Sequence, residues 1–328
     1  MYRIPNFEER RRLLRVAAGA TALTVPGLGR AQEKTRLRFI VPFPAGTGTD
    51  QAARLFAKVI TDKTGRPVTV ENKPGANGFI GVQAAMTAPP DGNTVFIGAN
   101  STLSTNAATF KQLPYDPVGD FSLLSLLVMI PTFIIVSANS PFTNIGQLFE
   151  EARRRPGAMN YASGSVTYQL MMEWLHEQAK VRSTCIPYKG ANEARMAVLS
   201  GDVDYAISDA GEDVASLVKA GKFRALMHSY TKRSPLLPDV PSAPEAGYPE
   251  FIALTWAAAA VSSKTPQAVT DQLRALFAEC AASPEVQEFY TRRSTPQLSL
   301  GPAELQRFQR QEVERWERIV AQIGFVKQ

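Results

Sequence analysis

Short apolar segments rich in β-formers alternate with amphipathic segments along most of this 328-residue chain, and this alternation constrains the fold most strongly. Leu37–Phe43 is typical of a buried strand, and Gln51–Lys63 carries apolar residues with helical periodicity. The same order of patterns restarts after Pro131, with Phe133–Val136 as a strand and Ile145–Arg155 as a helix. This alternation predicts parallel sheets covered by helices.

We therefore expect an α/β protein with two lobes, each an open, mostly parallel sheet flanked by helices. A chain of this length exceeds the usual size of one hydrophobic core, which supports two domains. The predicted boundaries assign residues 32–130 and 252–328 to domain 1, and residues 131–251 to domain 2. In open α/β sheets ligands bind beyond the carboxyl ends of the strands, so we expect a ligand cleft between the lobes.

Residues 1–31 have the three parts of an export signal. Arg10–Arg15 is positively charged, Val16–Leu28 is apolar, and Gly29–Ala31 ends in a small residue that suits cleavage. Two adjacent arginines also resemble a twin-arginine signal, so the export route stays open. The alternative is an amphipathic N-terminal helix on a cytoplasmic protein. No later stretch is long and apolar enough to span a bilayer, and we expect a periplasmic protein.

The formal charge of +6 arises mainly in this N-terminal segment. Without its six Arg and two Glu, the chain has 30 basic and 28 acidic residues, a net charge of +2. No basic stripe remains, so nucleic acid is not an expected partner. The two cysteines, Cys185 and Cys280, have no metal-binding spacing. We expect buried free thiols, although a disulfide in an oxidising compartment stays open.

Three loops between a predicted strand and a predicted helix could carry function, because helix starts expose unpaired N–H groups. Pro44–Asp50 holds two glycines and two threonines but matches neither a dinucleotide fingerprint nor a P-loop. Asn100–Ser104 and Ser163–Thr167 place hydroxyls at helix starts, which suits a carboxylate or a polar neutral ligand. For each loop alone, helix capping is the simpler explanation.

The competing hypothesis is a periplasmic hydrolase that uses Ser163 or Ser165 as its nucleophile. The sequence has two histidines, His176 inside a helical pattern and His228 at a strand end, and neither belongs to a recognisable catalytic motif. No nucleophile elbow or metal-binding motif occurs, so we expect no metal and no cofactor. A histidine within hydrogen-bond distance of either serine is the geometry that would favour the enzyme.

A set of short motifs follows one order along the chain: Arg38–Asp50 (RFIVPFPAGTGTD), Val70–Gly75 (VENKPG), Ala88–Gly92 (APPDG), Leu113–Phe121 (LPYDPVGDF), Asn160–Ser163 (NYAS), Pro187–Gly190 (PYKG), Gly201–Asp204 (GDVD), Ala220–Leu226 (AGKFRAL) and Arg233–Pro241 (RSPLLPDVP). Together they resemble the Bug family of periplasmic solute-binding proteins, the binding components of tripartite tricarboxylate transporters. The resemblance extends from about Thr35 over the rest of the chain. It implies a periplasmic-binding-protein type II fold with two lobes that close on a ligand.

The resemblance also implies that the first loop and the loop after Ser163 hold a ligand carboxylate, partly through ordered water. The ligands of the family are dicarboxylic and tricarboxylic acids, amino acids and aromatic acids. By position, the candidate ligand-binding residues are Phe43, Gly46, Thr47, Thr49, Asp50, Ser101, Thr102, Ser163, Ser165, Thr167 and Asp209.

This sequence departs from the family pattern at three places. The usual Gly-Gly of the first loop is Gly46-Thr47 here, and the loop after Ser163 is shorter, with Tyr168 and Gln169 in place of a serine and a histidine. Asp209 stands where a neutral Asn is common. A carboxylate there repels a ligand carboxylate unless it is paired, so a ligand with an amino or hydroxyl group could use Asp209.

The resemblance thus implies a receptor without catalytic activity that captures a small organic acid for tripartite-tricarboxylate-type uptake or for sensing. The implied partners are the ligand and either membrane transporter subunits or a sensor, and we expect the receptor to be a monomer. An orphan binder without a transporter stays open, since a partner would be encoded elsewhere.

Overall fold

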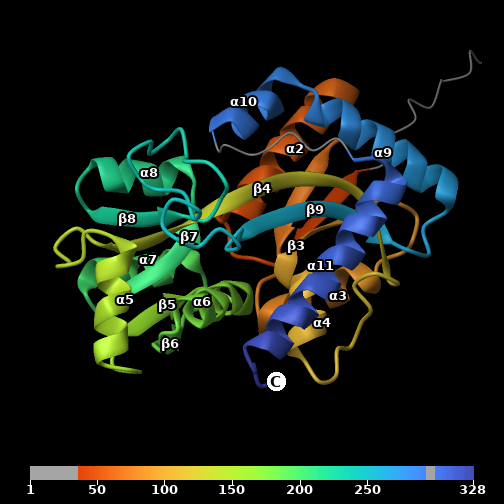
Figure 1. Cartoon of the computed structure of the whole chain (residues 1–328). Coiled ribbons are helices and arrows are strands. Elements are labelled where there is room, and N and C mark those ends of the chain that lie inside the picture. Colours follow the sequence, from red (N-terminus) through yellow and green to blue (C-terminus); the bar gives the residue numbers. More distant parts are fainter. Residues whose placement is uncertain (1–35, 293–299) are drawn as a thin grey trace, which may run out of the picture. The chain divides into compact units, whose positions relative to one another are not determined.

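One nine-stranded mixed sheet runs through residues 36–292 and 300–328, which the computed structural model describes (Figure 1). The predicted export signal, residues 1–31, lies outside the described residues. The strands are β1 (Leu37–Val41), β2 (Val68–Asn72), β3 (Thr94–Ala99), β4 (Phe121–Ser137), β5 (Asn160–Ser163), β6 (Thr184–Pro187), β7 (Tyr205–Asp209), β8 (Phe223–His228) and β9 (Leu254–Ser262). They follow the order β2-β1-β3-β9-β4-β7-β5-β6, and β8 also pairs with β4.

Helices cover both faces of this sheet (Figure 1). Among the described residues, no helix is both long and apolar enough to cross a membrane. The helices are α2 (Gly48–Thr64), α3 (Phe79–Met86), α4 (Asn106–Thr109), α5 (Ile145–Arg154), α6 (Val166–Ala179), α7 (Ala191–Ser200), α8 (Glu212–Lys219), α9 (Gln267–Ala281), α10 (Pro284–Arg292) and α11 (Pro302–Gln322).

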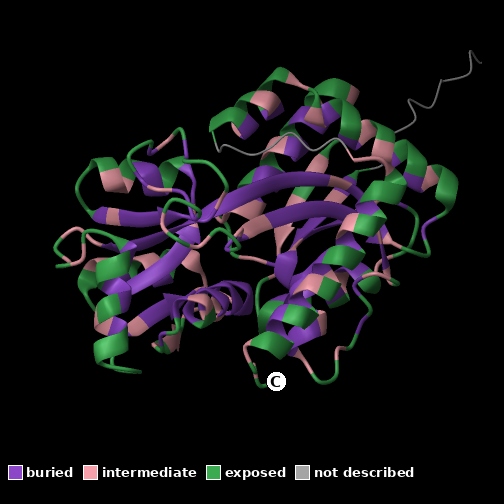
Figure 2. Cartoon of the chain, in the orientation of Figure 1, coloured by how far each residue is buried: buried purple, intermediate pink, exposed green. Residues whose placement is uncertain are grey.

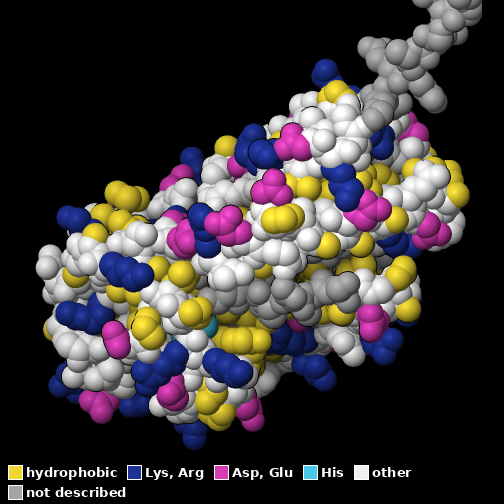
Figure 3. Space-filling model, turned by 90° about the horizontal axis from the view of Figure 1, so that it is seen from above, with side chains coloured by type: hydrophobic (Ala, Val, Ile, Leu, Met, Phe, Trp, Pro, Cys, Tyr) yellow, Lys and Arg dark blue, Asp and Glu magenta, His cyan; other side chains and the backbone are white. Residues whose placement is uncertain are grey.

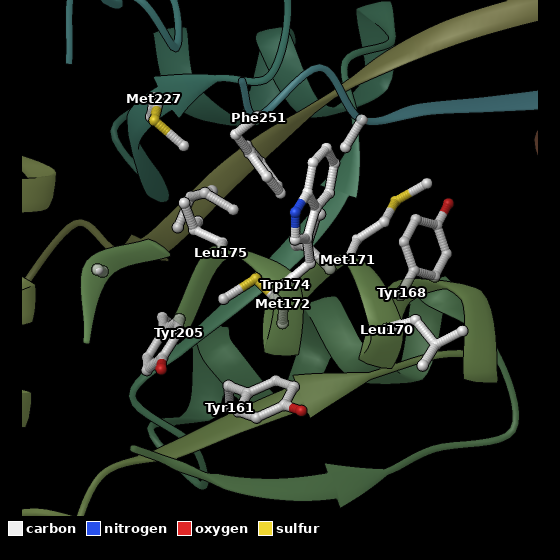
Figure 4. Close-up of a cluster of buried hydrophobic side chains, with 14 of the residues drawn as sticks. Tyr161, Tyr168, Leu170, Met171, Met172, Trp174, Leu175, Tyr205, Met227 and Phe251 are labelled. Atoms are coloured by element: carbon white, nitrogen blue, oxygen red, sulfur yellow. The ribbon is translucent and has the colours of Figure 1, made fainter. Parts of the chain in front are cut away.

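The apolar stripes of the helices pack on strands that are buried along most of their length (Figure 2). Phe277 of α9 stacks on both Phe39 of β1 and Phe56 of α2, with ring centroids 5.8 Å apart in each case. In the other half of the sheet, α6 contributes Trp174, whose ring lies 5.3 Å from that of Phe251 (Figure 4). These layers are the packing that the alternating strand and helix patterns predict.

Strand β4 joins the two halves of the sheet. Its first part, Phe121–Pro131, pairs with β9, and the part from Thr132 to Ser137 pairs with β7 and β8. All of these pairings are antiparallel, whereas β1 with β2 and β3, and β5 with β6 and β7, are parallel. The prediction of two separate, mostly parallel sheets was therefore wrong, because the described residues form one curled mixed sheet.

Pro131 explains this error. A proline lacks the N–H that a central strand donates, so the sequence pattern favours a strand that starts only at Phe133. In the structure Pro131 lies opposite Leu254, at the point where β4 exchanges β9 for its other partners. The proline therefore lies where β4 changes its partner strands, and the strand continues through it.

Candidate functional site

A cavity of about 120 Å³ lies where loops from both halves of the sheet meet. Loops that follow the parallel strands β1, β3, β5 and β6 line it, together with the end of β7. Val128 and Ile130 of β4 and Thr255 of β9 complete the wall. The carboxyl ends of the strands thus converge on one cavity, as expected for an α/β sheet.

Asp50 fixes the shape of the first loop. Its side chain is 1% exposed, and its carboxylate accepts hydrogen bonds from the Gly46 N–H (2.8 Å), Arg54 Nε (3.0 Å) and Asn72 Nδ2 (2.8 Å). Burial alone would raise the pKa of Asp50, but the hydrogen bonds from Arg54, Gly46 and Asn72 lower this pKa below its ordinary value. Gly46 has a φ of +83°, which only glycine adopts readily. The carboxylate therefore stays ionised and holds the loop in a glycine-dependent conformation.

Three helices begin at the cavity. Thr47 caps α2 by accepting a hydrogen bond from the Asp50 N–H (3.4 Å), and Ser165 caps α6 by accepting one from the Tyr168 N–H (3.4 Å). Gly190 begins α7 without a side-chain cap. Each helix start presents N–H groups and the positive end of its dipole. The cavity wall therefore suits an anion.

Eight of the predicted ligand-binding residues line the cavity and three do not. Thr102 is fully buried, and its hydroxyl donates to the Ala99 carbonyl (3.2 Å). The Ser163 hydroxyl donates to the Ser165 carbonyl (2.6 Å), and Asp50 supports the first loop from behind. The residues in the lining are Phe43, Gly46, Thr47, Thr49, Ser101, Ser165, Thr167 and Asp209.

Asp209 is the last residue of β7 and lies half-buried in the cavity wall. Its Oδ1 accepts hydrogen bonds from the Tyr168 hydroxyl (2.7 Å) and the Thr255 hydroxyl (2.8 Å). Burial, and then the charge of Asp209, raise the pKa of Tyr168 well above its ordinary value. Tyr168 therefore remains a neutral donor to Asp209.

Two basic side chains of the cavity, Lys189 and Arg195, were not among the predicted ligand-binding residues. Arg195 of α7 forms an ion pair with Asp213 of α8 (2.7 Å), and Lys189 precedes α7. The PYKG motif had indicated the loop that holds Lys189, and Arg195 lies one helical turn after Ala191, on the same side of α7. Lys189 could have been found because it lies in the loop before α7. Arg195 could have been found because it lies one helical turn after Ala191, the residue that follows this loop.

Neither histidine lies at the cavity. His176 is buried and hydrogen-bonds the Tyr205 hydroxyl through Nε2 (2.8 Å), and His228 Nδ1 donates to the Lys232 carbonyl (2.8 Å). Within residues 36–292 and 300–328, no histidine reaches Ser163 or Ser165, and no cluster of metal-ligating side chains occurs. The geometry that would favour a hydrolase is therefore absent from the described part of the chain.

Other proteins are similar to this chain over most of its length. The family described as the tripartite tricarboxylate transporter family receptor matches residues 52–325. A protein encoded in the tcbD–tcbE intergenic region of Pseudomonas sp. strain P51 is 31% identical over 94% of this chain and 94% of its own length. Protein BugT of Bordetella pertussis is 28% identical over 88% of this chain and 89% of its own length.

Solved structures share the fold. A protein of R. palustris with adipate superposes with a TM-score of 0.83 at 27% identity, covering 89% of this chain and 98% of its own. MatC of Rhodopseudomonas palustris, with bound malate, superposes with a TM-score of 0.79 at 27% identity, covering 87% of this chain and 98% of its own. The chain therefore belongs to the tripartite tricarboxylate transporter receptor family of Bug-type periplasmic solute-binding proteins, which are receptors and not enzymes.

Proposed function

We propose that this receptor captures a small organic acid in the cavity described above and delivers it unchanged to the membrane subunits of a tripartite tricarboxylate-type transporter or to a sensor. The observation that carries the proposal is the convergence of the first turns of α2, α6 and α7 on one cavity. Two related structures contain adipate and malate, and both ligands are dicarboxylates.

The helix starts can supply the affinity that such a receptor needs. A hydrogen bond from an N–H group to a charged carboxylate contributes about 1.5–3 kcal/mol. Three or four such bonds, with the dipole contribution of roughly 0.3–1 kcal/mol at each helix start, reach the ~8 kcal/mol of a micromolar complex. Thr49 and Ser101 lie in the same wall, and their hydroxyls supply further donors. The Thr167 hydroxyl donates to the Thr105 hydroxyl (3.3 Å) instead.

The cavity also has a suitable size and lining. An engineered cavity of about 150 Å³ holds one benzene molecule, so a cavity of about 120 Å³ accommodates one small acid. Phe43, Val128 and Ile130 provide apolar wall for a carbon skeleton. An aliphatic or aromatic acid would thus contact apolar side chains along its skeleton and helix starts at its carboxylate.

We propose further that residues 32–130 with 252–328 and residues 131–251 act as two lobes that close on the ligand, as a monomer. The cavity is lined from both ranges, by the loop at Gly46 and Thr255 on one side and by α6, α7 and Asp209 on the other. β4 and the segment before β9 connect the ranges, and a small change in backbone angles there would move one range against the other.

The direct test is a thermal-shift screen of the chain that lacks residues 1–31. The panel contains dicarboxylates, tricarboxylates, amino acids, aromatic acids and the neutral amides of the same acids. A ligand at 100 times its dissociation constant stabilises the folded state by about 2.7 kcal/mol, which for a protein of this size corresponds to roughly 4 °C. An increase in melting temperature with one class of acid, and no increase with the neutral amides of those acids, supports the proposal. If no acid raises the melting temperature and a neutral compound does, the proposal is wrong.

A matched pair of variants tests whether the first loop holds the ligand. Gly46 and Gly157 have similar φ values of +83° and +78°, and at both positions an added Cβ meets no atom within 4 Å. Gly46→Val and Gly157→Val therefore introduce the same backbone strain, about 1–2 kcal/mol. Gly157 precedes β5 and the cavity loop follows this strand, so only Gly46→Val should abolish binding. If a folded Gly46→Val variant binds the ligand with wild-type affinity, the first loop is not part of the binding site.

A further inference from the structure

Arg315 of α11 lies where three segments of the chain meet. Lys and Arg side chains stand out on the face of the molecule shown in Figure 3, whereas the Arg315 side chain is 28% exposed. Its guanidinium carbon lies 5.4 Å from the ring centroid of Trp174 in α6 and 5.7 Å from that of Trp316 in α11. Its Nη2 donates to the Ile252 carbonyl just before β9, and its Nη1 pairs with Glu312 (3.2 Å). Cation–π contacts and hydrogen bonds thus connect α11 with α6 and with the segment before β9.

Glu312 extends this network to the cavity. Its Oε2 accepts a hydrogen bond from the indole N–H of Trp256 in β9 (2.8 Å), and Trp256 belongs to the cavity lining. The main-chain N–H of Trp256 donates to Oδ1 of Asn100 (2.5 Å), which also lines the cavity. The network therefore runs from the cavity wall through α11 to α6.

Helix α6 belongs to residues 131–251, here called lobe 2, and contacts residues of lobe 1 (32–130 with 252–328) along its length. At the cavity end the Thr167 hydroxyl donates to the Thr105 hydroxyl (3.3 Å), and near the last turn Glu177 accepts from Gln322 of α11 (2.9 Å). Between these points apolar side chains of α6 and α11 share one buried cluster, which includes Leu170, Trp174, Trp316, Ile319 and Val320. Separation of the two helices would expose this cluster to water, so they stay in contact when the lobes move.

The first loop and the start of α7 line another part of the cavity, one from each lobe. The Gly46 N–H of the first loop donates to the Asp50 carboxylate, so this hydrogen bond stays within lobe 1. Gly46 is exposed, as are Lys189 and Asn192 at the start of α7. Moving these two walls apart therefore exposes little additional apolar surface.

We infer that α6 and α11 form a fixed pivot, held by Arg315, and that the lobes open between the first loop and α7. The chain itself joins the lobes at β4 and at the segment before β9, and Arg315 binds this segment through Ile252. The axis of the motion passes through these connections and the pivot, and a ligand enters on the side of the first loop and α7. This inference rests on the lobe motion of the proposed function and gives that motion an axis and a mouth.

Two pairs of spin labels test the inference without any ligand. The mouth pair is placed at Ala45 in the first loop and at Met196 in α7, and the pivot pair at Lys180, which ends α6, and at Ala321 in α11. All four side chains are exposed, so the labels disturb no packing. Double electron–electron resonance measures the distribution of distances within each pair. The distribution of the mouth pair should be at least about twice as broad as that of the pivot pair.

Variants connect the pivot to one residue. Arg315→Ala removes both ring contacts and both hydrogen-bonding nitrogens, so the distribution of the pivot pair should become at least about 1.5-fold broader. Arg315→Lys keeps a positive charge near Trp174 but loses the planar guanidinium, and its distribution should be broader than that of the wild type and narrower than that of Arg315→Ala. Arg318→Ala is the matched control, because it removes an exposed arginine from the same helix and should change neither pair. All proteins carry Cys185→Ser and Cys280→Ala, so that labels attach only to the introduced cysteines.

Each outcome supports or overturns the inference. If the pivot pair of the wild-type protein has a distribution as broad as that of the mouth pair, α6 and α11 separate and the inference is wrong. If a folded Arg315→Ala protein keeps the wild-type distribution of the pivot pair, Arg315 does not hold the pivot. Should Arg315→Ala fail to fold, an unchanged pivot pair in Arg315→Lys leads to the same conclusion. Because no ligand is needed, failure of every acid in the thermal-shift screen rejects the proposed capture of an acid and leaves these distances to be judged separately.

Discussion

Replacing Asp50 by alanine should loosen the first loop of the cavity without touching the ligand. The Asp50 carboxylate faces the back of the loop, where it accepts hydrogen bonds from Gly46, Arg54 and Asn72. Asn72 also donates to the Phe43 carbonyl (3.1 Å), so the same network reaches both ends of the loop. Removal of the carboxylate takes one acceptor away from the exposed Gly46 N–H and from the half-buried Asn72 amide, and it frees the loop to move.

The magnitude follows from these contacts. The lost bonds from the Gly46 N–H and the Asn72 amide cost about 1 kcal/mol each, because water can reach both donors once the carboxylate is gone. The Arg54 side chain is 52% exposed, so its ion pair with Asp50 contributes less than about 1 kcal/mol. The free energy of unfolding should therefore fall by about 2 kcal/mol, or roughly 3 °C in melting temperature for a chain of this size.

Thermal unfolding and calorimetric titration of one preparation measure both consequences. Asp50→Ala should lower the melting temperature and weaken ligand binding by at least about 10-fold, since the ligand must then order the loop. Asp62→Ala is the control on the same helix: its carboxylate pairs with Lys58, both side chains are about 60% exposed, and neither quantity should change. Wild-type affinity in Asp50→Ala would refute the assignment of Asp50 as the anchor of the loop.

The charge of Asp50 also gives a pH dependence of known sign. Its pKa in the folded protein is lower than the ordinary value of 3.8 that the unfolded chain retains. The stabilisation due to its charge is therefore complete above about pH 3.8 and is lost as the pH falls through the lower folded-state pKa. The difference in stability between wild type and Asp50→Asn should be constant near neutral pH and shrink only in strong acid.

Two further predictions concern backbone packing and the cysteines. An added Cβ at Gly164 would lie 2.5 Å from the Ala191 nitrogen, so Gly164→Ala should displace the start of α7, cost about 1–3 kcal/mol and weaken binding, whereas Gly190→Ala, with no atom within 4 Å, should leave the melting temperature unchanged; equal melting temperatures for the two variants would contradict this. Cys185 and Cys280 are free thiols, and burial raises the pKa of Cys280 to about 11, so native protein at pH 8 should show no reductant-sensitive mass and no alkylation of Cys280 until it unfolds.

Helices and strands could be predicted from the sequence better than the pairing of the strands in the sheet. The helices predicted at Gln51–Lys63 and Ile145–Arg155 are observed at Gly48–Thr64 and Ile145–Arg154, because apolar periodicity is a local signal. The joining of the two halves through β4 depends on pairing with β9, a segment far along the chain. No local pattern encodes such a partner, and Pro131 concealed the continuity of the strand.

The candidate site could likewise be predicted only in part. Loops at the ends of strands could be found from glycines and hydroxyls, and the lining includes Gly46 and Ser165. The sequence could not distinguish a residue that faces the cavity from one that supports a loop from behind, which is the difference between Thr49 and Asp50. Arg195 lies inside α7. Whether its side chain reaches the cavity depends on the rotation of α7 about its own axis, which a sequence pattern does not define.

The position of β9 has a consequence for the order of folding. This strand lies between β3 and β4 in the sheet, yet it is synthesised after every other strand. Until β9 has been synthesised and has paired, β3 and the first part of β4 have no common neighbour. Each then has an unpaired edge that can associate with other chains. Because β9 must also close a long loop before its contacts form, the sheet is completed late and slowly. A nascent or truncated chain that ends before Leu254 would therefore depend on chaperones rather than on its own partial fold.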